Sequence, residues 1–259
     1  MKTLIAVPMK DPALCKTRLA DSLSTEARKD LARLLYRRTL DFLAPLAEDG
    51  ATDVAVVTGE GEAADVARSY GMQVITEDAP GSLINAVETA SAWACAQGYD
   101  RLCVIPADLV APIQNDLRRF LNSTAAVTIC PSSDQGTNAL LVSAPDAISF
   151  HYGPRSALAH FSAAERAGLT PVLMPLASLS FDLDPSSCLS RAMTIDPEIK
   201  AVCQCRVGFK SLRFPAFLTF SRAMTWRGSS AIASRPLAVC RTVIFCVWPI
   251  RSSQRPKAM

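Results

Sequence analysis

Short, almost continuous apolar runs alternate along this chain with longer segments in which apolar residues recur every three to four positions. The first pattern is typical of strands buried on both faces, and the second of helices that bury one face. Strands that alternate with helices predict an α/β fold in which a mostly parallel central sheet lies between two helical layers, a three-layer α/β/α arrangement. The expected strands are 3–8, 52–58, 72–76, 102–106, 125–130, 139–142, 171–175 and 179–183, and the expected helices are 25–46, 62–70, 83–95, 113–121 and 156–167.

The distribution of charge divides the chain near residue 198. All 24 Asp and Glu lie at or before Glu198, where 16 Lys and Arg give a net charge of −8, and residues 199–259 carry 11 Lys and Arg without any acid. We therefore expect an enzyme-like domain over 1–198 and a basic, irregular extension over 199–259. The alternative is an extension that binds nucleic acid or an anionic membrane, because an acid-free basic segment attracts polyanions. The extension has neither a zinc-ligand spacing nor an RNA-binding motif, so no nucleic-acid partner is expected.

Cysteine usage and hydropathy indicate a cytoplasmic protein. The nine cysteines form no CxxC pair, which fits reduced thiols better than a disulfide framework. No apolar run reaches the ~18 residues that a membrane span needs, and nothing near the N-terminus resembles a signal peptide. With only two histidines in the chain, a mechanism that needs several imidazole ligands is not expected.

Three cations follow the first expected strand. Lys10, Lys16 and Arg18 lie on the turn between residues 3–8 and the next helix. Ligands of α/β proteins collect outside the carboxyl ends of the strands, and a cationic loop at that place suits phosphate groups. A loop whose charges are simply solvated is the alternative.

Acidic residues follow two further strands. Residues 106–109, which include Asp108, come directly after the apolar run 102–105, and this place at the end of a strand aims the Asp108 carboxylate into the same crevice. Asp182 and Asp184 are two residues apart, so in an extended segment both carboxylates point to one face and can approach one cation. Oxygen-rich sites of this kind suit Mg²⁺ together with substrate phosphates. The alternatives are helix caps, at Asp108 and at Asp184 before Pro185.

Two glycine-containing segments complete the set of motifs. Residues 136–141, which include Thr137, open an expected strand, and residues 152–156, which include Gly153 and Ser156, open an expected helix. Free backbone N–H groups at such places bind anions, and glycine permits close approach. Each segment is equally compatible with an ordinary turn.

In their order along the chain, these motifs resemble those of the 2-phospho-L-lactate guanylyltransferase family over about residues 1–192. The shared strings are P-x-K-x5-K-T-R-L, P-A-D-L, G-T-N-A-L-L, Y-G-P-x-S and D-x-D. The resemblance implies a nucleotidyltransferase fold of the glycosyltransferase-A type, GTP as donor, Mg²⁺ as cofactor, and 2-phospholactate, phosphoenolpyruvate or 3-phosphoglycerate as acceptor. Such enzymes act in making coenzyme F420, so the resemblance also implies a downstream deazaflavin transferase that takes the product. A homodimer is compatible with it.

The resemblance also implies roles for individual residues. The GTP triphosphate would be bound by Lys10, Lys16 and Arg18, and Asn85 would lie near the nucleoside. Lys16, Arg18 and Asp108 would be the catalytic residues. The metal would be held by Asp108, Asp182 and Asp184, and the acceptor by Thr137, Gly153 and Ser156.

Four positions depart from the pattern of the family. Val110 stands where the family usually has Pro, and Ala157 stands where it often has Phe. Leu83-Ile84 replaces the Gly-Leu before Asn85, and residues 185–188 replace an acidic run. None of these departures removes a predicted metal ligand. The replacement of Gly-Leu by Leu83-Ile84 falls in the segment that, in the family, lies near the base of the nucleotide.

The expected reaction joins two polyanions. A phosphate oxygen of the acceptor would attack the α-phosphorus of GTP in line and expel pyrophosphate, without a general base because the phosphate is already largely dianionic at pH 7. If the helix face with Ser91 and Cys95 lines the acceptor pocket, its small side chains leave room for 3-phosphoglycerate; these positions are equally compatible with packing. Two alternatives remain. One is a nucleotidyltransferase for another phosphorylated acceptor, although residues 8–19 lack the glycines of those families, and the other is a non-catalytic binding protein driven by the basic extension.

Overall fold

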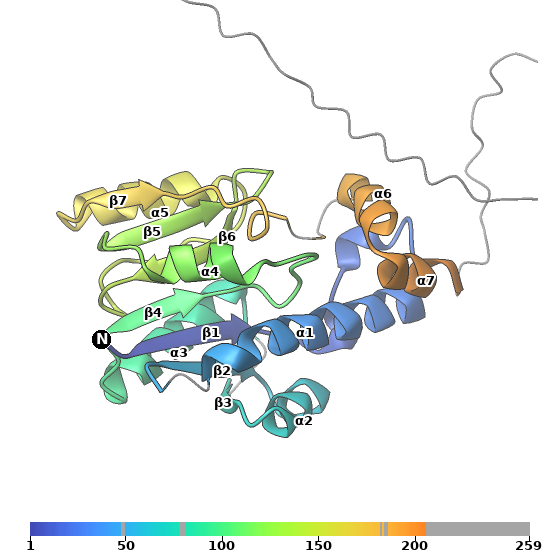
Figure 1. Cartoon of the computed structure of the whole chain (residues 1–259), viewed down its shortest axis with the longest axis horizontal. Helices are drawn as coiled ribbons and strands as arrows, with labels where there is room; N and C mark the ends of the chain where they lie inside the picture. The colour runs from blue at the N-terminus through green and yellow to red at the C-terminus, as the bar shows by residue number, and fades with distance from the viewer. Residues whose placement is uncertain (48–49, 78–80, 182, 184–185, 206–259) are drawn as a thin grey trace, which may run out of the picture. The chain divides into compact units, whose positions relative to one another are not determined.

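The computed structural model describes residues 1–47, 50–77, 81–181, 183 and 186–205. In this part of the chain, seven strands form one sheet with the order β3-β2-β1-β4-β6-β5-β7 (Figure 1). Neighbouring strands are parallel except that β6 runs antiparallel to both β4 and β5. The strands are β1 (Thr3–Pro8), β2 (Thr52–Thr58), β3 (Gln73–Thr76), β4 (Arg101–Val104), β5 (Val127–Pro131), β6 (Thr137–Val142) and β7 (Pro171–Leu173).

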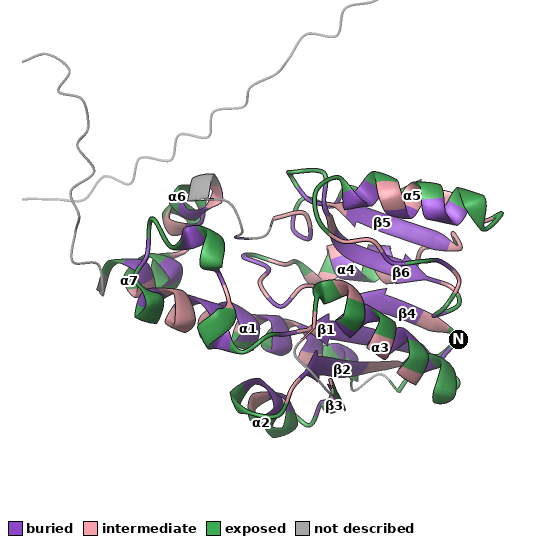
Figure 2. Cartoon of the chain, turned by 180° about the vertical axis from the view of Figure 1, so that it is seen from behind, coloured by how far each residue is buried: buried purple, intermediate pink, exposed green. Residues whose placement is uncertain are grey.

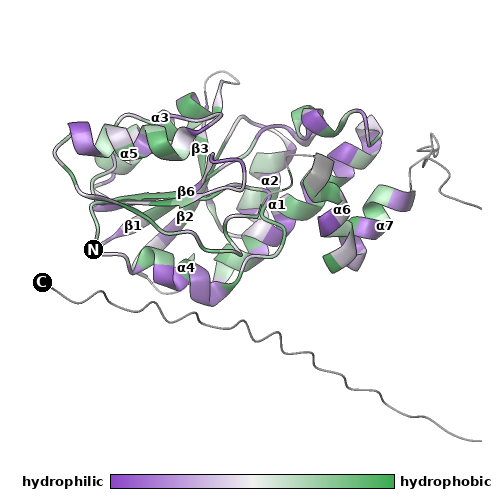
Figure 3. Ribbon diagram, turned by 90° about the horizontal axis from the view of Figure 1, so that it is seen from above, coloured by the Kyte–Doolittle hydropathy of each residue, from purple (hydrophilic) through white to green (hydrophobic). Residues whose placement is uncertain are grey.

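Helices cover both faces of the sheet, which confirms the predicted three-layer α/β/α fold. Figure 3 looks along the sheet and shows α3 and α5 on one side and α4 on the other. The described helices are α1 (Thr25–Ala47), α2 (Glu62–Ser69), α3 (Leu83–Ala96), α4 (Gln114–Leu121), α5 (Ser156–Arg166), α6 (Ser186–Ile195) and α7 (Pro197–Cys205), with short 3-10 helices at Pro12–Leu14 and Thr17–Leu19. None of them is long and apolar enough to cross a membrane.

The central strands are apolar throughout because both of their faces are buried (Figure 2). On β1, Ile5 and Val7 pack into one apolar cluster with α1, α2 and α4, whereas Leu4 and Ala6 pack into a second cluster with α3 and α5. All four side chains are fully buried. This two-sided burial explains why the strand pattern in the sequence is continuous rather than alternating.

A third apolar cluster lies away from the sheet, where α6 and α7 pack against the first half of α1. Ile199 and Cys203 of α7 are buried there. Arg38 of α1 donates hydrogen bonds to the carboxylates of Asp196 and Glu198. The charge boundary at residue 198 therefore falls inside helix α7, and residues 206–259 of the predicted extension lie outside the described part of the chain.

The strand predicted over residues 179–183 is wrong. The described residues of this segment form a turn, in which the N–H groups of Leu179 and Ser180 donate to the carbonyl of Leu176 at 2.9 and 2.8 Å. The carbonyl of Leu179 accepts a hydrogen bond from the Asn138 amide at 3.0 Å. Leu176 and Leu179 fill the core from this turn, so their apolar character reflects packing rather than strand formation.

Candidate active site

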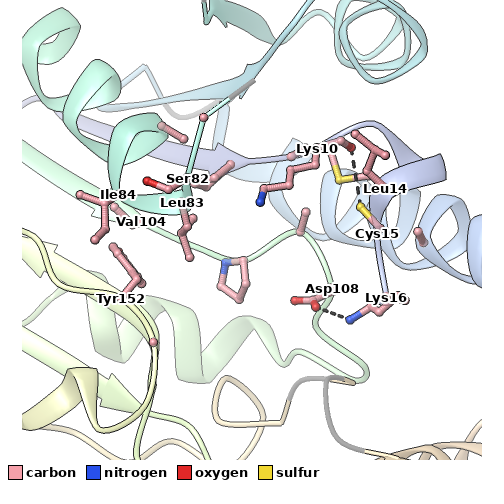
Figure 4. Close-up of a pocket in the computed structure, with 18 of the residues that line it drawn as sticks. Lys10, Leu14, Cys15, Lys16, Ser82, Leu83, Ile84, Val104, Asp108 and Tyr152 are labelled. Carbon is pink, nitrogen blue, oxygen red and sulfur yellow. Dashed lines mark hydrogen bonds and ion pairs between the residues drawn. The ribbon is translucent and has the colours of Figure 1, made fainter. Parts of the chain in front are cut away.

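A cleft of about 480 Å³ opens where β1 and β4 end and β6 begins. Its position follows from the topology. Parallel β1 and β4 deliver the residues after their carboxyl ends to one edge of the sheet, and antiparallel β6 brings its first residues to the same edge. The cleft is lined from these three elements and from the start of α3 (Figure 4).

Lys16 and Asp108 meet in this cleft (Figure 4). The ammonium group of Lys16 donates to Asp108 Oδ2 and, at 3.1 Å, to the carbonyl of Leu183. The side chain of Lys16 is only 4% exposed, and a buried ammonium is stable only when oxygens surround it. Lys16 also has a φ of 56°, a left-handed conformation that a non-glycine residue keeps only where its surroundings hold it.

The predicted metal site is described only in part. Asp182 and Asp184 lie outside the described residues, whereas Leu183 between them lies at the Lys16 ammonium. Within the part of the chain that the structure describes, no three His, Cys, Asp or Glu side chains gather as a metal site. The position between Asp108 Oδ2 and the Leu183 carbonyl already holds the positive charge of Lys16, so these oxygen donors suit a cation.

The other predicted phosphate-binding cations line the same cleft. Lys10 and Arg18 are both exposed to solvent at its rim. The loop that carries them is ordered by Asp11, which caps the first 3-10 helix by accepting from Ala13 N at 2.8 Å. The thiol of Cys15 donates to the Asp11 carbonyl at 3.4 Å, and burial raises its pKa, so this cysteine is a neutral part of the loop.

Asn85 does not line the cleft. It forms a cap for α3, in which Asn85 N donates to Ser82 Oγ at 3.3 Å and Ser82 Oγ donates to Asn85 Oδ1 at 3.1 Å. Gly81 and Ser82, which directly precede α3, do line the cleft. Glu77, after β3, also lines it and was missed by the sequence analysis; its position follows β3 in the same way that Asp108 follows β4. Burial raises the pKa of Glu77, and Lys10 opposes this effect.

The third group of predicted residues lies at the β6 end of the cleft. Thr137 and Gly153 line the cleft, and Ser156 lies behind them with its hydroxyl donating to Thr137 Oγ1 at 3.2 Å. Gly153 has a φ of 118°, a backbone conformation that residues other than glycine rarely adopt. Asn138 and Tyr152 also line this end, and neither was singled out in the sequence.

Of the two interpretations left open for Ser91 and Cys95, the structure supports packing rather than a place in the acceptor pocket. Ser91 is buried, and its hydroxyl donates to the Pro145 carbonyl at 2.8 Å. Cys95 is exposed beside Asp146. Both residues lie on α3 beyond the residues that reach the cleft, so their small size reflects helix packing and the surface.

The cleft thus combines cations, the carboxylates of Asp108 and Glu77, and hydroxyl groups, and no histidine lines it in the described part of the chain. Such a site can bind a polyanion and neutralise charge that develops on it. It offers no imidazole for proton transfer. Reactions that depend on positioning and charge neutralisation, such as transfer of a phosphoryl or nucleotidyl group, fit this composition.

Comparison with known proteins gives a consistent result. A family model described as "Guanylyl transferase CofC like" matches residues 1–201. A 3-phospho-D-glycerate guanylyltransferase from Colwellia psychrerythraea is 36% identical over 71% of this chain and 88% of its own length. A 2-phospho-L-lactate guanylyltransferase from Methanothermobacter thermautotrophicus is 29% identical over 71% of this chain and 81% of its own length. A solved nucleotidyl transferase from Methanothermobacter covers 77% of this chain and 98% of its own with a TM-score of 0.51 at 15% identity, which supports the fold alone.

Proposed function

Because the chain belongs to the family of CofC-like guanylyl transferases, we propose that it transfers GMP from GTP to a three-carbon phospho-acid and releases pyrophosphate. The acceptor we favour is 3-phospho-D-glycerate, since a 3-phospho-D-glycerate guanylyltransferase is 36% identical to this chain over 187 residues. The observation that carries the proposal is the meeting of Lys16 and Asp108 in a cleft whose other end presents Thr137.

The order of the strands supports a division of the cleft. Glu77, Gly81 and Ser82 lie toward β3 and α3, which suits the nucleoside of GTP. Lys10, Lys16 and Arg18 follow β1, in the middle of the sheet, which suits the triphosphate. Thr137 and Gly153 lie on the β6 side, which suits the acceptor. The three substrate groups would then lie in one line along the edge of the sheet.

The reaction itself needs little covalent chemistry from the protein. A phosphate oxygen of the acceptor forms a bond to the α-phosphorus of GTP, the bond between that phosphorus and the oxygen of the β-phosphate breaks, and pyrophosphate leaves. No proton has to move, because a phosphate monoester with a second pKa of ~6 is already largely dianionic at neutral pH. Bringing the two polyanions together is the main barrier, and Lys10, Lys16 and Arg18 would lower it by neutralising charge.

Asp108 would hold Mg²⁺ together with Asp182 and Asp184, which lie outside the described residues. The ion, when bound, neutralises phosphate charge. The carboxylate of Asp108 faces the cleft with a quarter of its surface exposed, so it is accessible to a cation once Lys16 turns toward the phosphates. The product would pass to a deazaflavin transferase in coenzyme F420 biosynthesis, and this partner, like a homodimer, stays a prediction.

Incubation of the full-length protein with Mg²⁺, GTP and each of the three phospho-acids tests the proposal. We expect release of pyrophosphate with at least one acid, 3-phosphoglycerate first, together with a guanylylated product detected by mass. Asp108→Asn should lower turnover by about 100-fold or more, whereas Asp146→Asn, at an exposed acid away from the cleft, should not change it. A folded wild-type protein that releases pyrophosphate with none of the three acids, or a fully active Asp108→Asn variant, would refute the proposal.

A further inference from the structure

One buried titratable side chain close to the cleft has no part in the reaction outlined above. His160 lies on α5, is fully buried, and does not line the cleft. Its Nδ1 atom is 2.9 Å from Thr137 Oγ1, and its Nε2 atom accepts a hydrogen bond of 2.9 Å from the backbone N–H of His151. The ring therefore connects the acceptor end of the cleft to the loop before α5.

These contacts determine which nitrogen carries the proton. A backbone N–H can only donate, so Nε2 of His160 must present its lone pair to His151. Burial, with a smaller contribution from His151, lowers the pKa of His160 to about 4, although a hydrogen bond with the Ser156 backbone opposes this effect. The ring is therefore neutral at physiological pH, and its single hydrogen lies on Nδ1, from which it is donated to Thr137 Oγ1.

The hydroxyl group of Thr137 receives a second hydrogen bond, since Ser156 Oγ donates to Thr137 Oγ1 at 3.2 Å. A hydroxyl oxygen has two lone pairs and one hydrogen. With both lone pairs occupied by His160 and Ser156, the Thr137 hydroxyl can only donate to a third group. Thr137 lines the cleft and is half-buried, so this donor faces the cleft.

We propose that His160 is a positioning residue for the acceptor, because it fixes the Thr137 hydroxyl as a hydrogen-bond donor toward an anionic oxygen of the phospho-acid. Carboxylate and phosphate oxygens accept hydrogen bonds and cannot donate them when ionised, so a hydroxyl with a fixed direction matches this class of ligand. The inference rests on the proposed function for the identity of the ligand. The direction of the hydroxyl itself follows from its contacts with His160 and Ser156.

Two substitutions separate the two hydrogen bonds of the ring. In His160→Asn, the amide nitrogen can take the place of Nδ1 and donate to Thr137, while the acceptor for His151 N is lost. In His160→Gln, the longer amide can accept from His151 N, while the donor to Thr137 is lost. We expect His160→Gln to raise the KM for the phospho-acid about tenfold, as for loss of a hydrogen bond to a charged group, with the KM for GTP unchanged. His160→Asn should keep a KM for the phospho-acid near that of the wild type.

Thr137→Val removes the donor itself and is the reference for the test. If His160 acts through Thr137, adding His160→Gln to Thr137→Val should not raise the KM for the phospho-acid any further. Equal effects of His160→Asn and His160→Gln, or effects that add in the double variant, would show that His160 only supports the fold and would overturn the proposal.

The tautomer is measured independently of activity. In the wild-type protein without substrates, the ¹⁵N NMR shifts of the His160 ring should show a neutral imidazole protonated at Nδ1 at pH 7. A ring protonated at Nε2 would overturn the proposal, even if all variants at position 160 failed to fold. Lack of turnover with any phospho-acid in a protein that shows the Nδ1–H tautomer would instead refute the proposed function.

Discussion

Acidification from pH 7 to pH 5 is expected to destabilise this protein because His160 takes up a proton more readily in the unfolded chain than in the folded protein. The ordinary pKa of a histidine is 6.5, and burial lowers that of His160 to about 4. Between these two values the unfolded chain binds a proton that the folded protein does not bind. The free energy of unfolding therefore falls as the pH falls through this window, and the contribution is fully present only above pH 6.5.

The magnitude follows from the width of the window. A difference of about 2.5 pH units at about 1.4 kcal/mol per unit corresponds to a total loss of roughly 3 kcal/mol below pH 4. At pH 5 about 2 kcal/mol of this is already lost, because the unfolded histidine is almost fully protonated there and the folded one is not. His160 has no exposed surface, so solvent does not screen the effect. A loss of this size is a large fraction of the 5–15 kcal/mol by which domains are typically stable.

Urea unfolding of the wild type and of His160→Asn, each at a series of pH values from 7 to 4.5, measures this loss. The wild type should lose about 2 kcal/mol more than the variant between pH 7 and pH 5. Hydrogen bonds from Tyr99 and Arg38 lower the pKa values of Asp53 and Asp196, and these carboxylates lose their contribution only at lower pH and equally in both proteins. Identical pH dependence in the two proteins would refute the reasoning.

Two further predictions concern the end of the folded unit and the acceptor loop. Removal of residues 206–259 should leave turnover intact. Removal of residues 197–259 also deletes α7 with its buried side chains and should lower the Tm by roughly 10 °C, as measured by calorimetry. Equal Tm values for the two truncated proteins would contradict the packing of α7. Gly153→Ala should cost about 1–2 kcal/mol of stability, because φ is 118° there, and should raise the KM for the phospho-acid but not for GTP. Gly98→Ala, at a φ of 71° on the surface after α3, is the matched control, and a comparable KM change in that variant would contradict the placing of Gly153 at the acceptor.

The sequence predicted those parts of the fold that depend on local pattern. β2 has the predicted bounds, Thr52–Thr58, because a strand buried on both faces needs an unbroken run of apolar and β-branched residues. The meeting of Lys16 and Asp108 was also predictable, since both residues follow strands whose carboxyl ends share one edge of the sheet. Their hydrogen bond shows that the argument from strand ends correctly located this part of the cleft.

The rest of the candidate site depends on tertiary contacts that leave no local pattern. The direction of β6 brings Thr137 to the cleft, and a single apolar run does not reveal whether its strand is parallel or antiparallel. His160 lies 23 residues from its partner Thr137, and only the packing of α5 against the sheet brings them together. The surroundings of Ser91 stayed open for the same reason, because helix periodicity says which residues share a face but not what that face contacts.

The contacts of Lys16 have a consequence for the order in which the protein is built. Asp108 and Leu183, which both accept hydrogen bonds from it, lie 92 and 167 positions further along the chain. During synthesis, all seven described strands have left the ribosome before Leu183 does. Until then, the Leu183 carbonyl, which is one of the oxygens that contact the Lys16 ammonium, is missing. The loop that carries Lys16 is thus among the first segments of the protein to be made, and its contact with Leu183 is among the last to form.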